Sequence, residues 1–434
     1  MIGRAGIGQD ARSEQAHADG PSRHTRTPLH IVPEAISAGP FVIHGNPSRT
    51  GIGSGGDDRA IDRMDAADRR FMALAIALGR RNLGRVWPNP AVGCVIVRQG
   101  RILGRGWTAP GGRPHAETRA LEQAGRAAAG ATAYVSLEPC AHHGVTPPCA
   151  GALAAAGVAR VVSAIEDPDR RVAGAGHAAL REAGVAVEVG LMADEAAGAH
   201  RGFLLNRREG RPMVTLKLAT TLDGRIATAA GESRWITGAQ ARRVVHAMRL
   251  GHDAVLVGGG TARADDPELT VRGMGDVAQP VRVVATAGLD LPEGARLFEA
   301  LPRAPLWLCH GADAPEARRR DAEARGARLI EVGEGPGGLD PGALLAALGR
   351  AGLTRVLCEG GGRLAAALLG AGVVDEIVLF SAGLALGGDA RAALGALGLA
   401  RLAEAPRFTL IEARPVGGDL LQRWRRTSGP GGVI

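Results

Sequence analysis

The feature that most constrains the fold is a regular alternation of short apolar runs with longer segments of helical spacing. In residues 64–205 the runs AVGCVIV, TAYVSL and RVVSAIEDP are separated by HAETRALEQAGRAA and CAGALAAAG. Strands joined by helices of this length need crossover connections, which build a sheet with helices packed against it. The alternation predicts an α/β layered domain that opens with an amphipathic helix around Phe71 and closes near Asn206.

A second alternation of the same kind begins at MVTLKLA. Its strand-like runs are AVLVGGG, VRVVATAG, WLCHGA, RLIEVGEG, RVLCEGGG and EIVLFSAG, and helical segments such as GALLAALGRAG lie between them. The polar stretch 206–212 separates the two alternations and is typical of a linker. We therefore predict two α/β domains, residues 64–205 and 213–428, joined by residues 206–212.

Residues 1–63 mix Gly, Ser, Pro, Asp and Arg without any sustained period. Such a segment cannot bury enough apolar surface to form a core, so we expect a disordered extension. The alternative is that translation begins at Met64, because the first helical pattern starts directly after it.

The charged residues are strongly biased: 51 of the 52 basic residues are Arg, and the formal net charge is +8. The arginines form no block of five or six, which favours a solvated surface over a nucleic-acid site. No apolar run is long enough to span a membrane, and no secretory signal is present. Five cysteines in 434 residues are typical of a reducing compartment. We expect a cytoplasmic protein with neither a nucleic-acid nor a membrane partner.

The strongest local motif is His115-Ala116-Glu117, followed by Pro139-Cys140 and then Cys149. One imidazole and two thiolates leave a fourth tetrahedral position open for water, as catalytic zinc requires. Glu117 could carry the proton between that water and a leaving amine. This order of residues is the signature of zinc deaminases. The alternative is a structural zinc with a fourth ligand from His142 or His143, which would leave Glu117 without a role.

Two strand-to-glycine-to-helix junctions stand out in the second domain, at residues 255–261 and 356–362. Backbone amides of such junctions can cradle a phosphate, although a tight turn explains the glycines equally well. The single lysine, Lys217, lies in a mostly apolar strand. An unpaired ammonium is costly there, so we expect it to reach a cavity or an anion.

The gap between the two cysteines is too long for a cytidine deaminase, and here the motifs become more specific. P-N-P-x-V-G-C-V-I-V from Pro88 to Val97, H-A-E, and L-E-P-C-x-H-x-G-x-T-P-P-C resemble the deaminase domain of the bifunctional riboflavin-biosynthesis deaminase-reductase. K-x-A-x-x-L-D-G-x-x-A, S-x-W-I-T-G, H-x-x-R, G-G-G-T-x-x-x-D-D-P-x-L-T-x-R and E-G-G resemble the reductase domain of the same family.

The resemblance implies a three-layer, cytidine-deaminase-like first domain and a second domain similar to dihydrofolate reductase. It also implies one Zn²⁺ per chain, NADPH, a small phosphoribosyl pyrimidine substrate and a homo-oligomer. The first domain would remove the 2-amino group of 2,5-diamino-6-ribosylamino-4(3H)-pyrimidinone 5′-phosphate, and the second would reduce the ribosyl chain to ribityl. Val145 stands where the family often has Arg or Lys, which weakens the expectation of a phosphate contact in the deaminase site.

The resemblance further implies a role for individual side chains. Two arginines suit a phosphate because each presents a planar fork of donors. The implied zinc ligands are His115, Cys140 and Cys149, with Glu117 as the proton shuttle; Lys217 and Asp265 would assist the reduction; Ala219, Trp235, Thr261, Asp265, Gly361, Gly362, Arg363 and Leu364 would contact NADPH; and Asn89, Ser233, Arg249, Leu269, Arg272 and Glu359 would contact the substrate.

Overall fold

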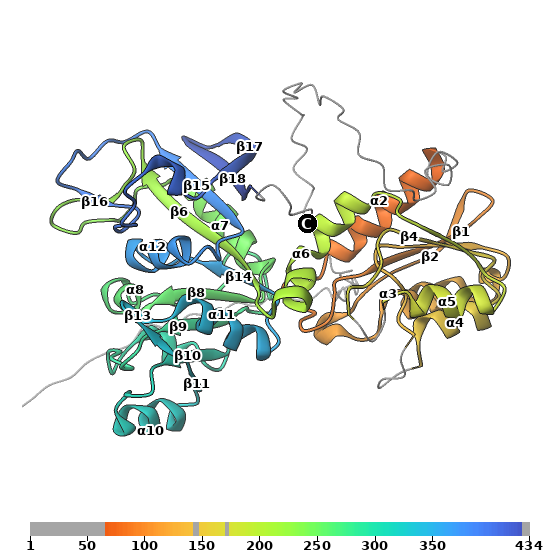
Figure 1. Ribbon diagram of the computed structural model, residues 1–434, viewed down its shortest axis with the longest axis horizontal. Helices are drawn as coiled ribbons and strands as arrows, with labels where there is room; N and C mark the ends of the chain where they lie inside the picture. The colour runs from red at the N-terminus through yellow and green to blue at the C-terminus, as the bar shows by residue number, and fades with distance from the viewer. Residues whose placement is uncertain (1–65, 142–146, 170–172, 428–434) are drawn as a thin grey trace, which may run out of the picture. The chain divides into compact units, whose positions relative to one another are not determined.

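The computed structural model describes residues 66–141, 147–169 and 173–427 (Figure 1). The expected N-terminal extension, residues 1–63, lies outside the described residues. So do Val145 and the alternative zinc ligands His142 and His143. None of the helices in the described part of the chain combines the length and apolar character needed to cross a bilayer.

The first domain is built on a five-stranded sheet in the order β2-β1-β3-β4-β5. Strand β1 is antiparallel to β2 and β3, whereas β3, β4 and β5 run parallel. In chain order the elements are α2 (Ala66–Arg80), β1 (Gly93–Arg98), β2 (Arg101–Trp107), α3 (Ala116–Ala124), β3 (Thr132–Val135), α4 (Cys149–Ala155), β4 (Arg160–Ser163), α5 (Ala175–Glu182), β5 (Ala186–Val189) and α6 (Ala193–Glu209), with short 3-10 turns at Pro110–Gly112 and Gly125–Ala128.

Helices cover both faces of this sheet. On one face Ala120, Leu153 and Leu180 of α3, α4 and α5 pack into a core with inward-facing residues of the strands. On the other face Met72 of α2 and Ala196 of α6 complete a second core. Because both faces bury apolar side chains against helices, the domain has the three layers that were predicted.

Strand β2 was not predicted, because two glycines and two arginines leave few residues that favour strands in Arg101–Trp107. Its glycines have a packing role. A β-carbon on Gly106 would lie 1.9 Å from the carbonyl oxygen of Ala116, and one on Gly104 would lie 2.1 Å from that of Ala120. Helix α3 therefore packs directly on the backbone of β2, which fixes the start of α3.

The expected linker is shorter than residues 206–212. Helix α6 continues to Glu209, and Gly210 ends it in the left-handed conformation with φ 69°, where its N–H bonds to the carbonyl of Asn206. Polar residues at the end of an exposed helix look like a linker in the sequence. Only residues 210–212 lie between α6 and the next strand.

The second domain is built on a nine-stranded sheet, counted over the described residues, in the order β11-β10-β9-β8-β14-β6-β15-β18-β17. The elements are β6 (Met213–Thr221), β7 (Arg225–Ala227), α7 (Ala239–Leu250), β8 (Ala254–Gly258), α8 (Gly259–Asp265), β9 (Val281–Ala285), α9 (Arg296–Glu299), β10 (Leu306–His310), α10 (Glu316–Ala324), β11 (Arg328–Glu331), β12 (Glu334–Gly335), β13 (Gly338–Leu339), α11 (Pro341–Arg350), β14 (Arg355–Cys358), α12 (Gly362–Gly370), β15 (Glu376–Ala382), β16 (Arg391–Ala392), a 3-10 turn at Leu402–Glu404, β17 (Phe408–Val416) and β18 (Asp419–Arg426).

Alternation along β6 decides which way its lysine faces. Leu216 packs into the core that α11 and α12 form on one face of the sheet. On the other face, residues of α7 form a core with Phe380 of β15. Because successive residues of a strand point to opposite faces, Lys217 faces the side that α7 covers.

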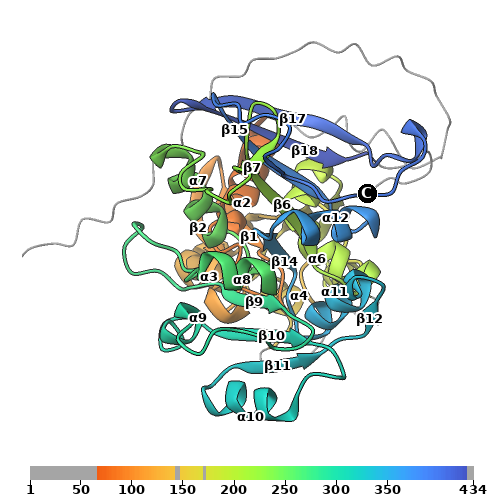
Figure 2. The same cartoon turned by 90° about the vertical axis from the view of Figure 1, so that its left-hand side faces the viewer.

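Strands β17 and β18 form a C-terminal hairpin that was not predicted, and they extend the sheet beyond β15 (Figure 2). Strand β17 is the edge of the sheet, and most of its side chains are partly or fully exposed. The sequence of β17, FTLIEARPV, has no regular alternation of apolar and polar residues from which to recognise it.

Candidate active sites

Three sequence-distant side chains of the first domain converge at the N-termini of two helices. His115 is the N-cap residue of α3, Cys149 is the first residue of α4, and Cys140 lies in the loop after β3. Nδ1 of His115 lies 3.7 Å from Sγ of Cys140 and 3.3 Å from Sγ of Cys149.

These distances suit a tetrahedral zinc ion. With usual Zn–S and Zn–N bond lengths and tetrahedral angles, the sulfur and nitrogen ligands lie about 3.6 Å apart, between the two observed values. The three ligand atoms all lie within 4.8 Å of one another. A soft set of one imidazole and two thiolates therefore fits zinc, and no fourth protein ligand joins the cluster among the residues that the structure describes.

The hydrogen bonds and charges within the cluster favour the thiolate form of Cys140. A hydrogen bond from the Cys149 thiol lowers the pKa of Cys140 to about 4, and contacts from His115 and the Cys149 amide act in the same direction. The Cys149 amide lies 3.4 Å from the Cys140 sulfur. A thiolate is the form of cysteine that binds metal.

Glu117 lies in the first turn of α3, and its side chain is buried beside the cluster. Burial, followed by the charge of Cys140, raises the pKa of Glu117 to about 7. A carboxyl group with a pKa near neutrality can both accept and return a proton, as a general acid and base must.

Glu138 is a further buried carboxylate of this site, to which the sequence analysis gave no role. Oε2 accepts hydrogen bonds from the amides of Asp167 and Gly174, and Oε1 from those of Gly176 and His177, at 2.9–3.2 Å. Glu138 thus ties the chain after β4 and the start of α5 to the loop that carries Cys140. Its position directly before Pro139-Cys140 was the only signal in the sequence.

Asn89 lies in the turn before β1, and its side-chain amide donates to the carbonyl of Gly112 at 3.2 Å. Gly112 has φ 85°, and a β-carbon there would lie 2.0 Å from Nδ2 of Asn89. Asn89 is therefore held against the turn that leads to His115.

In the second domain the strand register brings Lys217 next to Glu359. Cys358 of β14 pairs with Leu216 of the parallel strand β6, so the following residues, Glu359 and Lys217, are neighbours. Burial lowers the pKa of Lys217, and the carboxylate of Glu359 opposes this shift. The sequence predicted that Lys217 reaches a cavity or an anion, and the carboxylate of Glu359 is that anion.

Arg249 of α7 holds Glu359 in a two-pronged ion pair. Its Nε and Nη2 donate to the two carboxylate oxygens at 2.6 and 3.0 Å, and its Nη1 donates to the carbonyl of Thr270 at 2.7 Å. Burial alone raises the pKa of Glu359, but Arg249 and Lys217 hold it below its ordinary value. Each guanidinium nitrogen of Arg249 already has an acceptor within the protein.

Arg272 is the more available of the two arginines expected at a phosphate. Its side chain is 52% exposed and contacts one oxygen of Glu268 at 3.1 Å. Leu269, three residues earlier, is buried and adopts the left-handed conformation with φ 57°. A substrate contact at Leu269 would therefore come from its backbone.

The two glycine junctions lie side by side. Strands β8 and β14 are parallel neighbours, and the amide of Gly361 donates to Oγ1 of Thr261 at 3.0 Å. The side chain of Leu364 packs over Gly258 and Gly360. Gly361 is the N-cap of α12, with Gly362 and Arg363 in its first turn. The predicted nucleotide contacts of the two junctions are thus adjacent.

The remaining predicted residues lie in β6, in the loop between β7 and α7 and at the end of α8. Trp235 is 70% exposed, with the guanidinium of Arg242 4.4 Å from its ring centre. Asp265 ends α8, and its carbonyl accepts from Arg234 at 3.1 Å. Ser233 is half-buried, and Ala219 shares the face of β6 with Lys217.

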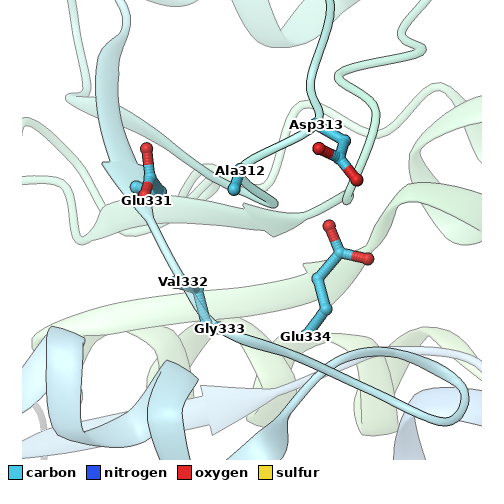
Figure 3. A pocket seen from close by; sticks show the side chains of 6 residues that line it. All are labelled: Ala312, Asp313, Glu331, Val332, Gly333 and Glu334. Atoms are coloured by element: carbon cyan, nitrogen blue, oxygen red, sulfur yellow. The ribbon is translucent and has the colours of Figure 1, made fainter.

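A hollow of about 280 Å³ lies at the ends of β10 and β11, away from the predicted residues (Figure 3). In it the side chains of Asp313 and Glu334 point toward one another. Carboxylates line it and no basic side chain does. This lining does not suit a phosphorylated substrate.

Fold and sites together define the class: a zinc-dependent deaminase domain followed by a nucleotide-dependent reductase domain. Residues 65–165 match the cytidine and deoxycytidylate deaminase zinc-binding region, and residues 212–422 match the RibD C-terminal domain.

Relatives of known function match nearly their whole length. The riboflavin biosynthesis protein RibD of Escherichia coli is 43% identical over 81% of this chain and 98% of its own, and that of Mycobacterium tuberculosis H37Rv is 41% identical over 81% and 95%. Two solved structures are also similar. RibD of Acinetobacter baumannii is 39% identical with a TM-score of 0.76, and the deaminase/reductase of Thermotoga maritima is 32% identical with a TM-score of 0.73; each alignment covers 83% of this chain and 99% of the other.

The chain belongs to the RibD family of riboflavin biosynthesis proteins. It is a bifunctional deaminase and reductase, with zinc as the cofactor of the first domain and NADPH that of the second.

Proposed function

We propose that the first domain hydrolyses the 2-amino group of 2,5-diamino-6-ribosylamino-4(3H)-pyrimidinone 5′-phosphate. The observation that carries this proposal is the convergence of His115, Cys140 and Cys149 beside the buried Glu117. His115 and the two cysteines would hold zinc, which supplies a Lewis acid that makes water nucleophilic at neutral pH. Glu117 takes the proton from water and gives it to the departing amine, so that water and substrate yield ammonia and the carbonyl product. Asn89 contacts the pyrimidine.

The second domain then reduces the opened ribosyl chain to ribityl. NADPH, when bound, would supply the hydride for the carbonyl carbon, and a protein group would give a proton to the oxygen. We assign that proton to Lys217, because the strand register places it beside Glu359 at the second glycine junction, and burial lowers the pKa of its ammonium. Asp265 assists as the second titratable group. Ser233, Leu269 and Arg272 contact the phosphoribosyl group. Arg249 and Glu359, which were also expected to contact the substrate, are paired with one another and fix the site.

The cofactor would lie across the two glycine junctions. Thr261, Gly361, Gly362, Arg363 and Leu364 are adjacent there, as the contact between Thr261 and Gly361 supports. Backbone amides at these junctions suit a pyrophosphate. Ala219 and Trp235 contact the nicotinamide nucleotide beside Lys217.

The experiment is a coupled assay on purified, zinc-loaded protein. The diamino substrate should release one ammonia per molecule, and the deaminated product should then oxidise one NADPH. Protein that releases no ammonia and oxidises no NADPH with these compounds would overturn the proposal.

We also propose that the protein acts in the cytoplasm as a homo-oligomer, without nucleic-acid or membrane partners. Its five cysteines are all free thiols, which suits a reducing compartment. Strand β17 offers an unpaired edge on which Leu410 and Ile411 are exposed, and a second copy could cover it. Light scattering of the native protein tests the oligomer, and a steep salt dependence of RNA binding would contradict the absence of a nucleic-acid partner.

A further inference from the structure

His246 has no role in the reaction as described so far, yet it contacts the segment that carries Arg272. It lies on α7 one turn before Arg249, so both side chains point the same way. Nδ1 of His246 accepts a hydrogen bond from the backbone amide of Arg272 at 3.2 Å. An imidazole nitrogen that accepts carries no proton, so the ring is neutral with its hydrogen on Nε2.

Two hydrogen bonds from α7 therefore fasten the segment 269–272. The first is the bond from Arg249 to the carbonyl of Thr270, and the second is the bond from the Arg272 amide to His246. The segment needs such support, because Leu269 holds a left-handed backbone conformation that residues other than glycine seldom adopt.

We propose that His246 is a positioning residue that fixes the backbone of Arg272 and so aims its guanidinium at the substrate phosphate. This inference rests on the proposed function of the second domain. Arg249 is committed to Glu359 and Thr270. Arg272 is 52% exposed and uses Nη1 to contact Glu268, which leaves its other nitrogens to meet the phosphate dianion. His246 acts through Arg272 and does not touch the reacting atoms.

The charges around His246 keep it in the accepting form. Burial lowers its pKa, followed by the guanidiniums of Arg249 on its own helix and Arg272 on the facing segment. The carboxylate of Glu359, at the end of β14, and the Thr270 carbonyl oppose this shift and are outweighed. The imidazole is therefore neutral at pH 7, and its protonation in acid would remove the acceptor.

The test compares two variants in the zinc-loaded, full-length protein. His246→Leu fills similar space without an acceptor, whereas His246→Asn places an amide oxygen where Nδ1 stands. We expect His246→Leu to raise the KM for the phosphorylated reductase substrate about three- to tenfold, which corresponds to the free energy of one hydrogen bond. The kcat and the affinity for NADPH should stay near those of wild type. His246→Asn should restore the KM.

Two further readouts separate positioning from general structural damage. Titration calorimetry with inorganic phosphate should show the same loss in His246→Leu and the same rescue in His246→Asn, without any need for turnover. Below pH 6.5 the KM of wild type should rise more steeply than that of His246→Asn, because only wild type has an imidazole that takes up a proton. The titration of the substrate phosphate is common to both proteins and cancels in the comparison. Equal phosphate affinity in wild type and His246→Leu, or a loss that His246→Asn fails to rescue, would overturn the inference. If wild type binds phosphate but does not reduce the substrate, the proposed function fails instead.

Discussion

Arg249 and Glu359, 110 residues apart in the sequence, form a two-pronged ion pair with N–O distances of 2.6 and 3.0 Å. Their side chains are only 11% and 9% exposed. The pair joins helix α7 to the end of β14 and places a carboxylate beside Lys217. A buried pair of this kind is costly to break, because the surviving charge is left without compensation.

Replacing Glu359 with Gln should therefore lower the free energy of unfolding by about 3–5 kcal/mol, since Arg249 would lose its counter-charge. Urea unfolding at pH 7 measures this change. Glu323→Gln, an exposed carboxylate on α10, is the matched control and should change stability by less than about 0.5 kcal/mol. A Glu359→Gln protein as stable as the control would show that the pair does not stabilise the fold.

Glu117→Gln should reduce ammonia release by at least about 100-fold, because an amide cannot take up and return the proton. Zinc content measured by atomic absorption should stay near that of wild type, since the ligand atoms that would hold zinc belong to His115, Cys140 and Cys149. NADPH oxidation with the deaminated substrate should also be unchanged. Loss of zinc from this variant would contradict the role given to Glu117.

Lys217→Arg should depress NADPH oxidation by about 100-fold and leave ammonia release intact. A guanidinium keeps the positive charge but does not release its proton at neutral pH, and its fork is wider than an ammonium. NADPH binding followed by fluorescence should change little. Unchanged reduction in this variant would remove Lys217 from the mechanism.

Glu138→Gln should destabilise the first domain by about 1–3 kcal/mol, because an amide nitrogen would replace an oxygen that accepts backbone N–H groups inside the protein. Hydrogen exchange should increase at the amides of Gly174, Gly176 and His177, which donate to this carboxylate. Glu182→Gln at the exposed end of α5 is the control. Equal stability of the two variants would show that the hydrogen bonds accepted by Glu138 do not stabilise the domain.

His252 should make the second domain acid-sensitive. Its Nδ1 donates to the Met248 carbonyl at 2.7 Å, and its Nε2 accepts from the Thr215 hydroxyl at 3.0 Å. Burial, followed by the charge of Arg355, lowers the pKa of His252 to about 3. The folded pKa lies below the unfolded value of about 6.5, so the stabilisation is complete above pH 6.5 and is lost as the pH falls toward 3.

At pH 4.5 this loss amounts to about 2–3 kcal/mol relative to pH 7. Urea unfolding of wild type and His252→Gln at both pH values isolates it, because other titrating groups are common to the two proteins. Between pH 7 and pH 4.5, His252→Gln should lose about 2–3 kcal/mol less free energy of unfolding than wild type. Identical pH dependence in both proteins would exclude His252 as the source.

Periodicity and motif spacing were sufficient to predict two α/β domains and the residues of the zinc cluster. Apolar runs of buried strands such as β8 and β14 are continuous because helices cover both faces, so the sequence reveals them. Strand β2 was missed because glycine and arginine interrupt its apolar residues, and the hairpin β17–β18 because neither strand alternates regularly between apolar and polar residues. The linker was placed too early, because exposed helix ends and linkers share a polar composition.

The sequence by itself determined which chemistry the protein carries. The ligand types of His115, Cys140 and Cys149, the nearby Glu117 and a single lysine in an apolar strand are local properties of the chain. Only the tertiary structure decided which distant residues act on one another. Strand register sets Glu359 beside Lys217, α7 commits Arg249 to that carboxylate, and His246 contacts the amide of Arg272. These relationships depend on the packing of helices against a sheet, which brings together side chains that no spacing in the sequence connects.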